Sequence, residues 1–436
     1  MKLIELTKDT MQNLLEDLLK RSPNQYGSYE TTVADIVNQV KTKGDEALFA
    51  FTKKFDHCEL NKNTIAVTKE EIEKAYAELD KDFIEVMKKS AENIRIFHEK
   101  QLRNSWIDTK EDGSILGQRI TPLEKVGVYV PGGKAAYPSS VLMNIIPAKT
   151  AGVETIIMTT PPDQNGKVNA GTLAAADIAG ADVIYKAGGA QAVAAMAFGT
   201  ESIPKVDKIT GPGNIFVALA KKAVYGYVSI DSIAGPSEIL VLADETANPR
   251  FVAADLLSQA EHDELASAIL ITTSRTLADA VSRQVEEFVN QLSRADIMKK
   301  SLENYGFILL APTMEDAVAA ANAIASEHLE ILTKNPFETM TKIKNAGAIF
   351  LGEYSSEPLG DYFAGPNHVL PTNGTARFFS PLNVDDFLKK TSIISYSKEA
   401  LSKVHADIEL FARNEGLTAH ENSIKVRFEA NGKAGE

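Results

Sequence analysis

The sequence predicts an α/β protein with two Rossmann-like domains, each built on a parallel sheet. From about residue 125, short β-branched stretches alternate with alanine-rich stretches, as in VGVYVPGG, ETIIMTTPP and AGTLAAADIAGA. Because parallel neighbouring strands need a crossover between them, this repeated strand–helix order favours a parallel sheet covered by helices. The pattern begins again at SEILVLAD and continues to AGAIFLG, which predicts a second α/β unit.

Two further regions flank these units. The first 110 or so residues are rich in charge and have helical periodicity, as in DFIEVMKKSAENIRIFHEKQL, and we expect them to pack on the second unit. The last region is long and rich in predicted helix. The predicted boundaries are 1–120 for the helical N-terminal region, 121–237 and 238–380 for the two Rossmann-like domains, and 381–436 for a C-terminal extension.

Composition narrows the function classes. The 436 residues include 46 Lys and Arg against 59 Asp and Glu, which gives a net charge of −13, and no basic run is present. Nucleic acid is therefore not expected as a partner, because its binding depends on neutralising phosphates. The N-terminus lacks a signal-peptide pattern and no apolar run reaches spanning length, so the sequence predicts neither export nor membrane insertion but a cytoplasmic protein.

Cys58 is the only cysteine, and it lies in the polar stretch KFDHCELNK. A single cysteine excludes both an intramolecular disulfide and a thiolate zinc cluster. Any bound metal must therefore use nitrogen and oxygen ligands.

Gln259 and His262 lie three residues apart near the end of a predicted helix, in LLSQAEHDE. The helix has a well-marked start, because Asn248 suits the N-cap and Pro249 the first helical position. The two side chains share a face and could hold a metal, but two ligands do not complete a site. Taken alone, they fit a polar helix edge better.

Glu327 and His328 are adjacent in IASEHLEIL, at the predicted end of a helix that begins with Thr313 and Asp316 as a capping box. Such a pair can act as acid and base near neutral pH. A histidine that simply stabilises the helix C-terminus is the commoner explanation.

The glycine- and proline-rich segment 355–382 is expected to be largely a loop, and it carries Asp361 and His368. Glu415 and His420 follow a predicted helix, and polar loop residues would explain all four. Three Gly-Pro turns, TGPGN, AGPSE and AGPNH, are expected at strand ends, where open α/β sheets bind ligands. As a dinucleotide fingerprint, Gly211 and Gly213 without a third glycine are weak.

The stretch IDSIAGPSEILVLADETANPRFVAADLLSQAEHD, residues 230–263, closely resembles the signature region of histidinol dehydrogenases. The resemblance continues, in the family's order, through VGVYVPGG, AGGAQAVAAMAFGT, ITGPGN, ASEHLEI, GDYFAGPNHVLPT, ARFFSPL and NEGLTAHENSI, and covers about residues 25–428. It implies oxidation of L-histidinol through L-histidinal to L-histidine in histidine biosynthesis, with two NAD and one zinc ion per site. It also implies a homodimer whose sites are shared between subunits, and the long C-terminal extension suits that role.

The resemblance also implies roles for particular residues. The zinc ligands would be Gln259, His262, Asp361 and His420, which would also contact the substrate together with Ser237, His368 and Glu415. The NAD contacts would be Tyr129, Gln191 and Asn214. His328 would be the base that takes the alcohol proton, and Glu327 would activate the water that hydrates the aldehyde.

Cys58 lies outside every matched motif, which argues against a covalent thioester intermediate of the kind many aldehyde-oxidising enzymes form. Two other classes of function remain open. A zinc hydrolase would need an open metal position and no nicotinamide. A non-catalytic binding protein would have no use for adjacent Glu327 and His328 beside a metal.

Overall fold

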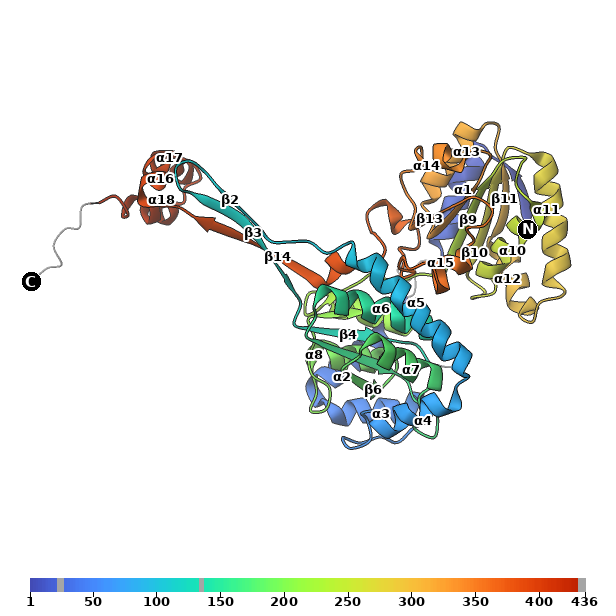
Figure 1. Cartoon of the computed structure of the whole chain (residues 1–436), viewed down its shortest axis with the longest axis horizontal. Coiled ribbons are helices and arrows are strands. Elements are labelled where there is room, and N and C mark those ends of the chain that lie inside the picture. Colours follow the sequence, from blue (N-terminus) through green and yellow to red (C-terminus); the bar gives the residue numbers. More distant parts are fainter. Residues whose placement is uncertain (22–26, 133–136, 430–436) are drawn as a thin grey trace, which may run out of the picture. The chain divides into compact units, whose positions relative to one another are not determined.

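The computed structural model describes residues 1–21, 27–132 and 137–429, and it divides the chain into two compact units (Figure 1). The first unit contains Met1–Leu102 and Leu123–Phe387, and the second contains Arg103–Pro122 and Leu388–Glu436. Gly133, the last residue of the VGVYVPGG motif, lies outside the described residues.

The first unit contains a five-stranded parallel sheet with the order β6-β5-β4-β7-β8. The helices α7 and α8 that connect its strands are alanine-rich and almost wholly buried, and such small side chains let a helix lie close to its neighbours. The strands are β4 (Lys125–Tyr129), β5 (Thr155–Thr160), β6 (Val183–Lys186), β7 (Lys208–Thr210) and β8 (Ser229–Ile230), and the connecting helices are α6 (Pro138–Ala151), α7 (Ala170–Ala179), α8 (Gly189–Phe198) and α9 (Ile215–Val224).

A second parallel sheet of the same unit has six strands in the order β1-β11-β10-β9-β12-β13. Two clusters of buried apolar side chains form its core. The strands are β1 (Lys2–Glu5), β9 (Glu238–Ala243), β10 (Ser267–Thr272), β11 (Gly306–Leu310), β12 (His328–Leu332) and β13 (Ala348–Leu351). The helices are α1 (Lys8–Leu19), α10 (Pro249–Ala260), α11 (Arg275–Val289), α12 (Ala295–Tyr305), α13 (Met314–Ile324), α14 (Pro336–Met340) and α15 (Glu357–Tyr362). The predicted fold class, α/β with two parallel sheets, is confirmed.

The N-terminal region is mainly helical and divides between the two sheets. β1 pairs with β11 at one edge of the six-stranded sheet, and α1 contributes Leu14 and Leu18 to that core. The helices α2 (Gly27–Lys43), α3 (Asp45–Phe55), α4 (Lys69–Glu78) and α5 (Lys81–Glu99) pack instead on helices of the five-stranded sheet. Within the described residues, no helix of this or any other region is long and apolar enough to cross a membrane.

The second unit combines two distant parts of the sequence. Its antiparallel sheet has the order β14-β3-β2, and β14 pairs along its whole length with β3. Its strands are β2 (Trp106–Thr109), β3 (Ile115–Pro122) and β14 (Leu388–Ser395), and its helices are α16 (Lys398–Ser402), α17 (His405–Asn414) and α18 (Thr418–Lys425). The C-terminal extension thus forms one sheet with β2 and β3, which come from residues 106–122.

Two local expectations from the sequence are wrong. His328 is not at a helix end but is the first residue of β12, because α13 ends at Ile324 and Ala325 turns the chain with φ 53°. Of the three Gly-Pro turns only TGPGN directly follows a strand, β7; AGPSE lies between the short strand β8 and β9, and AGPNH follows α15. The reason is that a turn motif marks a boundary of an element but not which boundary.

Candidate active site

Glu327 and His328 meet the first residue of the neighbouring strand β9. The backbone N–H of Glu238 donates to Oε2 of Glu327 at 2.9 Å, and the backbone carbonyl of Glu238 lies 3.0 Å from Nδ1 of His328. A carbonyl oxygen only accepts, so Nδ1 carries the hydrogen and, in the neutral ring, Nε2 is the free base. The Nδ1 atom also lies 3.7 Å from Oε2 of Glu327.

Both side chains are buried, and each changes the pKa of the other. Desolvation raises the pKa of Glu327, against the opposing effect of the neighbouring His328. Desolvation also opposes the charged form of His328, but Glu327 and Asp361 outweigh it and raise the pKa of the imidazole. The pair therefore holds protons more tightly than free side chains would, and compensating the charge of Asp361 lowers the pKa of His328 and so favours its neutral, proton-accepting form.

Asp361 lies between two imidazoles. Its Oδ1 is 3.6 Å from Nε2 of His328 and 3.9 Å from Nδ1 of His368. Desolvation alone would raise the pKa of Asp361, but His328 and His368 together lower it, so the carboxylate is ionised. His368 donates from Nδ1 to the backbone carbonyl of Asp361 at 3.0 Å, and its Nε2 is hydrogen-bonded to the Ser140 hydroxyl at 3.3 Å.

Helix α10 carries Gln259 and has the predicted start, with Asn248 as its N-cap and Pro249 as its first residue. Gln259 is fully buried, yet neither its amide oxygen nor its amide nitrogen has a hydrogen-bond partner among the described residues. Leaving a buried amide unpaired is costly, so the Gln259 side chain fits a role in binding a metal ion or a substrate. His262 follows the helix, and desolvation together with His328 lowers the pKa of its ring against the effect of Asp361.

Glu357 is a site residue that the sequence reasoning missed. It is buried, its Oε2 accepts from the Ser258 hydroxyl at 2.9 Å, and burial followed by the charge of Asp361 raises its pKa to about 7. Ligand atoms of His328, Glu357 and Asp361 all lie within 4.8 Å of one another. Glu357 and Asp361 are four residues apart on the short helix α15, so they lie on one face of it. This spacing could have indicated Glu357, but the prolines and glycines of the segment favour a loop, in which the spacing has no meaning.

These donors suit a divalent metal such as zinc, which accepts imidazole nitrogen and carboxylate or amide oxygen. The unpaired amide of Gln259 fits that role as well. The predicted ligands His262 and Asp361 lie within electrostatic reach of each other. The cluster formed by His328, Glu357 and Asp361 is an alternative set of donors that shares only Asp361 with the prediction.

Three of the predicted residues have other surroundings. Ser237 directly precedes β9, and its carbonyl accepts from the backbone N–H of Ser267 at 3.0 Å. Glu415 is the exposed C-cap of α17, and His420 is exposed on α18. Glu415 and His420 belong to the second unit, so their place in the site stays a prediction.

The predicted NAD contacts lie at the carboxyl edge of the five-stranded sheet. Tyr129 ends β4, and its hydroxyl accepts from the backbone N–H of Gly189 at 3.1 Å. Gln191, on α8, donates to Oδ2 of Asp56 at 3.4 Å, and Asn214 caps α9 directly after β7. The strand order reverses between β4 and β7, and open α/β sheets bind ligands at such a switch point.

Hydrogen bonds also join this part of the unit to the segment that carries Asp361 and His368. Ser140 stands near the start of α6, the helix after β4, and reaches His368. Asn367 donates to the Met143 carbonyl at 2.7 Å, and the Ser90 hydroxyl donates to the Tyr362 carbonyl at 2.6 Å. Helix α6, which follows β4, thus borders the segment that carries Asp361 and His368, and no sequence motif indicates Ser140.

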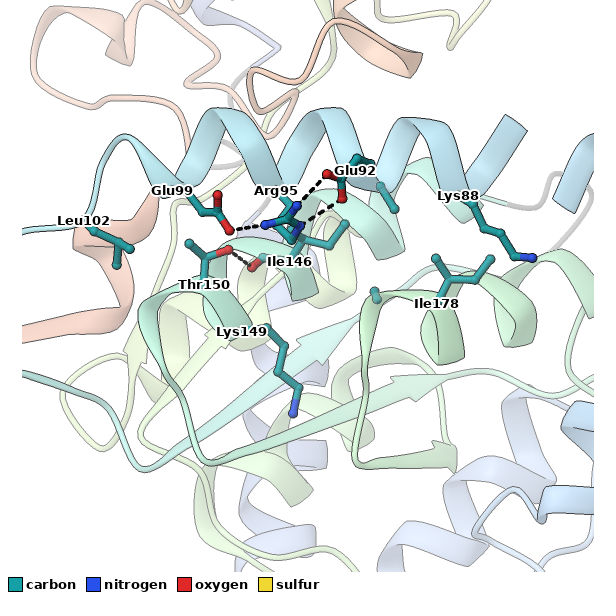
Figure 2. Close-up of a pocket in the computed structure, with 11 residues that line it drawn as sticks. Lys88, Glu92, Arg95, Glu99, Leu102, Ile146, Lys149, Thr150 and Ile178 are labelled. Atoms are coloured by element: carbon teal, nitrogen blue, oxygen red, sulfur yellow. Dashed lines mark hydrogen bonds and ion pairs between the residues drawn. The ribbon is translucent and has the colours of Figure 1, made fainter. Parts of the chain in front are cut away.

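A separate surface pocket of about 530 Å³ lies between α5, α6 and α7 (Figure 2). Arg95 is held there by Glu92 and Glu99, so its charge is compensated within the pocket wall. None of the predicted site residues, all of which lie in the described ranges, lines it.

The fold and the site define a class of protein: a two-sheet α/β enzyme. Its buried Glu and His side chains can exchange protons, its donor set suits a divalent cation, and the carboxyl edge of its five-stranded sheet is of the kind that binds nucleotides. A profile of the family "Histidinol dehydrogenase" matches residues 19–428. The histidinol dehydrogenase of Clostridium acetobutylicum is 58% identical over 417 residues, which cover 96% of each chain. That of Halalkalibacterium halodurans is 59% identical over 400 residues, 92% of this chain and 94% of that one.

The fold comparison agrees. The crystal structure of histidinol dehydrogenase from Elizabethkingia anophelis superposes with a TM-score of 0.92 at 39% identity, over 98% of both chains. The chain therefore belongs to the histidinol dehydrogenase family. It is an oxidoreductase of histidine biosynthesis.

Proposed function

We propose that the protein oxidises L-histidinol to L-histidine in two steps through L-histidinal, with NAD as the oxidant. The overall reaction takes one histidinol, one water and two NAD⁺ and gives one histidine, two NADH and three protons. The observation that carries the proposal is the buried pair Glu327 and His328, anchored on the Glu238 backbone and facing Asp361. Membership of the family supplies the substrate class.

In the first step His328 accepts the hydroxyl proton of the alcohol at Nε2, while the carbon gives its hydride to NAD⁺. The hydrogen bond from Nδ1 to the Glu238 carbonyl keeps Nε2 as the accepting atom. In the second step water adds to the aldehyde, with its proton passing to the Glu327 carboxylate. The resulting hydrate anion then gives the carbon's second hydride to another NAD⁺ and leaves as the carboxylic acid, which ionises to the carboxylate.

We further propose that Gln259, His262 and Asp361 hold one zinc ion together with His420 of a second copy of the chain. When bound, zinc would anchor the polar groups of the substrate and compensate the charge of Asp361, which favours neutral His328. The proposal is supported by the unpaired, buried amide of Gln259 and by the ionised state of Asp361. Ser237, His368 and Glu415 would complete the substrate contacts.

NAD would bind at Tyr129, Gln191 and Asn214, on the edge where the strand order reverses. No thiol is needed for the second oxidation. Cys58 is buried, and burial followed by nearby acidic groups raises the pKa of its thiol, so the nucleophilic thiolate is disfavoured. The absence of any intramolecular disulfide, with Cys58 as the single cysteine, is compatible with the proposed cytoplasmic location.

The test is to count the NADH formed per L-histidinol consumed by zinc-loaded protein in excess NAD at mildly alkaline pH. Two NADH, with histidine as product, are expected. One NADH would mean that the aldehyde escapes and that the role of Glu327 is wrong. No NADH from folded, zinc-loaded protein would favour a hydrolase or a different substrate.

Sharing of sites between two subunits is tested by complementation. His420→Ala and Glu327→Ala are each expected to be inactive, because each site would need both residues. When the two variants are mixed and re-associated, each heterodimer would contain one intact site out of two. The mixture is therefore expected to regain about a quarter to a half of the wild-type activity per site. Subunit exchange without any regained activity would show that the sites are not shared.

A further inference from the structure

Arg21 is a fully buried cation that follows α1 and its C-cap Lys20, and it is far along the chain from every predicted site residue. Its Nη2 pairs with Oε1 of Glu238 at 2.5 Å, and both side chains are almost completely excluded from solvent. Its Nη1 donates to the Leu265 carbonyl at 2.9 Å and its Nε to the Leu18 carbonyl at 3.3 Å. The guanidinium also lies 5.2 Å from the ring centre of Tyr305. Arg21 is therefore fixed from four directions.

Its partner Glu238 has an unusual position in the sheet. On one side Glu238 pairs in register with Ser267 of β10, but on the other side the pairing of β9 with β12 begins only at Ile239. The backbone N–H and carbonyl of Glu238 are instead bonded to the side chains of Glu327 and His328. One residue thus holds both members of the acid/base pair with its main chain while its side chain holds Arg21.

We propose that Arg21 is a positioning residue for the acid/base pair, acting through its ion pair with Glu238. The inference rests on the proposed function, in which Glu327 and His328 carry the proton transfers. The β12 side of Glu238 has no ladder partner, so besides the pairing with Ser267 of β10 it is the ion pair with Arg21 that fixes Glu238. A displaced Glu238 carbonyl would release the Nδ1 hydrogen of His328 and turn Nε2 away from the substrate.

A purely structural role is the alternative, since a buried ion pair is costly to break wherever it lies. The two roles differ in what they change. A structural pair alters thermal stability and leaves the kinetics of the folded enzyme unchanged. A positioning pair lowers kcat while KM stays nearly constant, because substrate and NAD still bind to groups that have not moved.

The test uses the zinc-loaded full chain with three variants. Arg21→Met alone would leave the Glu238 carboxylate buried without a partner, so it is combined with Glu238→Gln to keep the pair neutral and the protein folded. Arg21→Lys keeps the charge without the planar fork. The matched control is Lys208→Met, which breaks another ion pair, between the buried Lys208 and the partly exposed Asp386 at 3.2 Å; Asp386 also accepts from the backbone N–H of Asn383.

The double variant is expected to lose about ten- to a hundredfold in kcat, with both KM values within about threefold, because small displacements of catalytic groups have effects of this size. Arg21→Lys should recover part of the loss, and Lys208→Met should keep the wild-type constants. A double variant with the kcat of the control would overturn the proposal.

A second readout does not depend on activity. In ¹⁵N-histidine-labelled protein, the Nδ1–H resonance of His328, identified by its loss in His328→Gln, reports the bond to the Glu238 carbonyl. It should be present in wild type and in Lys208→Met, and should move upfield or disappear in the double variant. An unchanged resonance would overturn the positioning role. Wild type that forms no NADH from histidinol would instead refute the proposed function, and the resonance would still decide the role of Arg21.

Discussion

Asp56 offers a prediction in which the sign of a pH effect follows from burial. Its carboxylate accepts from Gln191, and desolvation raises its pKa from 3.8 to about 6, against a small opposing effect of His57. A raised pKa in the folded state means that the folded protein binds this proton more tightly than the unfolded chain does. The free energy that protonated Asp56 contributes to folding is fully present below about pH 4 and is lost as the pH rises through 6.

The substitution Asp56→Asn removes this titration. The difference between 3.8 and about 6 corresponds to about 3 kcal/mol at 1.36 kcal/mol per pKa unit, and partial exposure of Asp56 reduces it to about 1 kcal/mol. The variant should therefore match wild type near pH 4 and be more stable by about 1 kcal/mol at pH 8, or about 1–3 °C in the midpoint of thermal unfolding.

The measurement is the difference in thermal midpoint between variant and wild type at several pH values from 4 to 8. Asp163→Asn is the control of opposite sign. The backbone N–H groups of Lys167 and Asn165 lower the pKa of Asp163, so its stability is present at neutral pH and is lost in acid. A difference for Asp56→Asn that is constant with pH, or that grows toward acid, would refute the reasoning.

Two further predictions concern the ligand sites. His262→Ala should lower zinc affinity by more than about a hundredfold, whereas His328→Ala should keep the metal and lose turnover, as measured by zinc content after dialysis and by initial rates. Equal zinc loss in both variants would favour the cluster of His328, Glu357 and Asp361 as the metal site. Gly211→Ala should raise KM for NAD by more than about tenfold, because the added Cβ would lie 2.0 Å from the Tyr129 carbonyl oxygen at a φ of +115°. Gly226 has a φ of +98°, and a Cβ added there would have no heavy atom within 4 Å. Gly226→Ala therefore tests backbone strain without the clash and should leave the KM for NAD unchanged.

The structure also explains why some site residues could be found from the sequence and others could not. Gln259, His262, Glu327, His328 and Asp361 stand in short motifs specific enough to be recognised by resemblance. Glu357 and Ser140 stand in no such motif, and only packing brings them to His328 and His368. The motifs also did not show which end of a strand they occupy, so His328 was placed at a helix end instead of the start of β12.

The α/β class, the two parallel sheets and the N-cap of α10 at Asn248 could be predicted from the amino-acid sequence, because strand and helix periodicities and helix caps are local properties of the chain. The pairing of β14 with β3 and the ion pair of Arg21 with Glu238 could not be predicted in this way. These contacts join residues hundreds of positions apart. Their energy depends on burial and charge compensation in three dimensions, which leave no periodic pattern in the sequence.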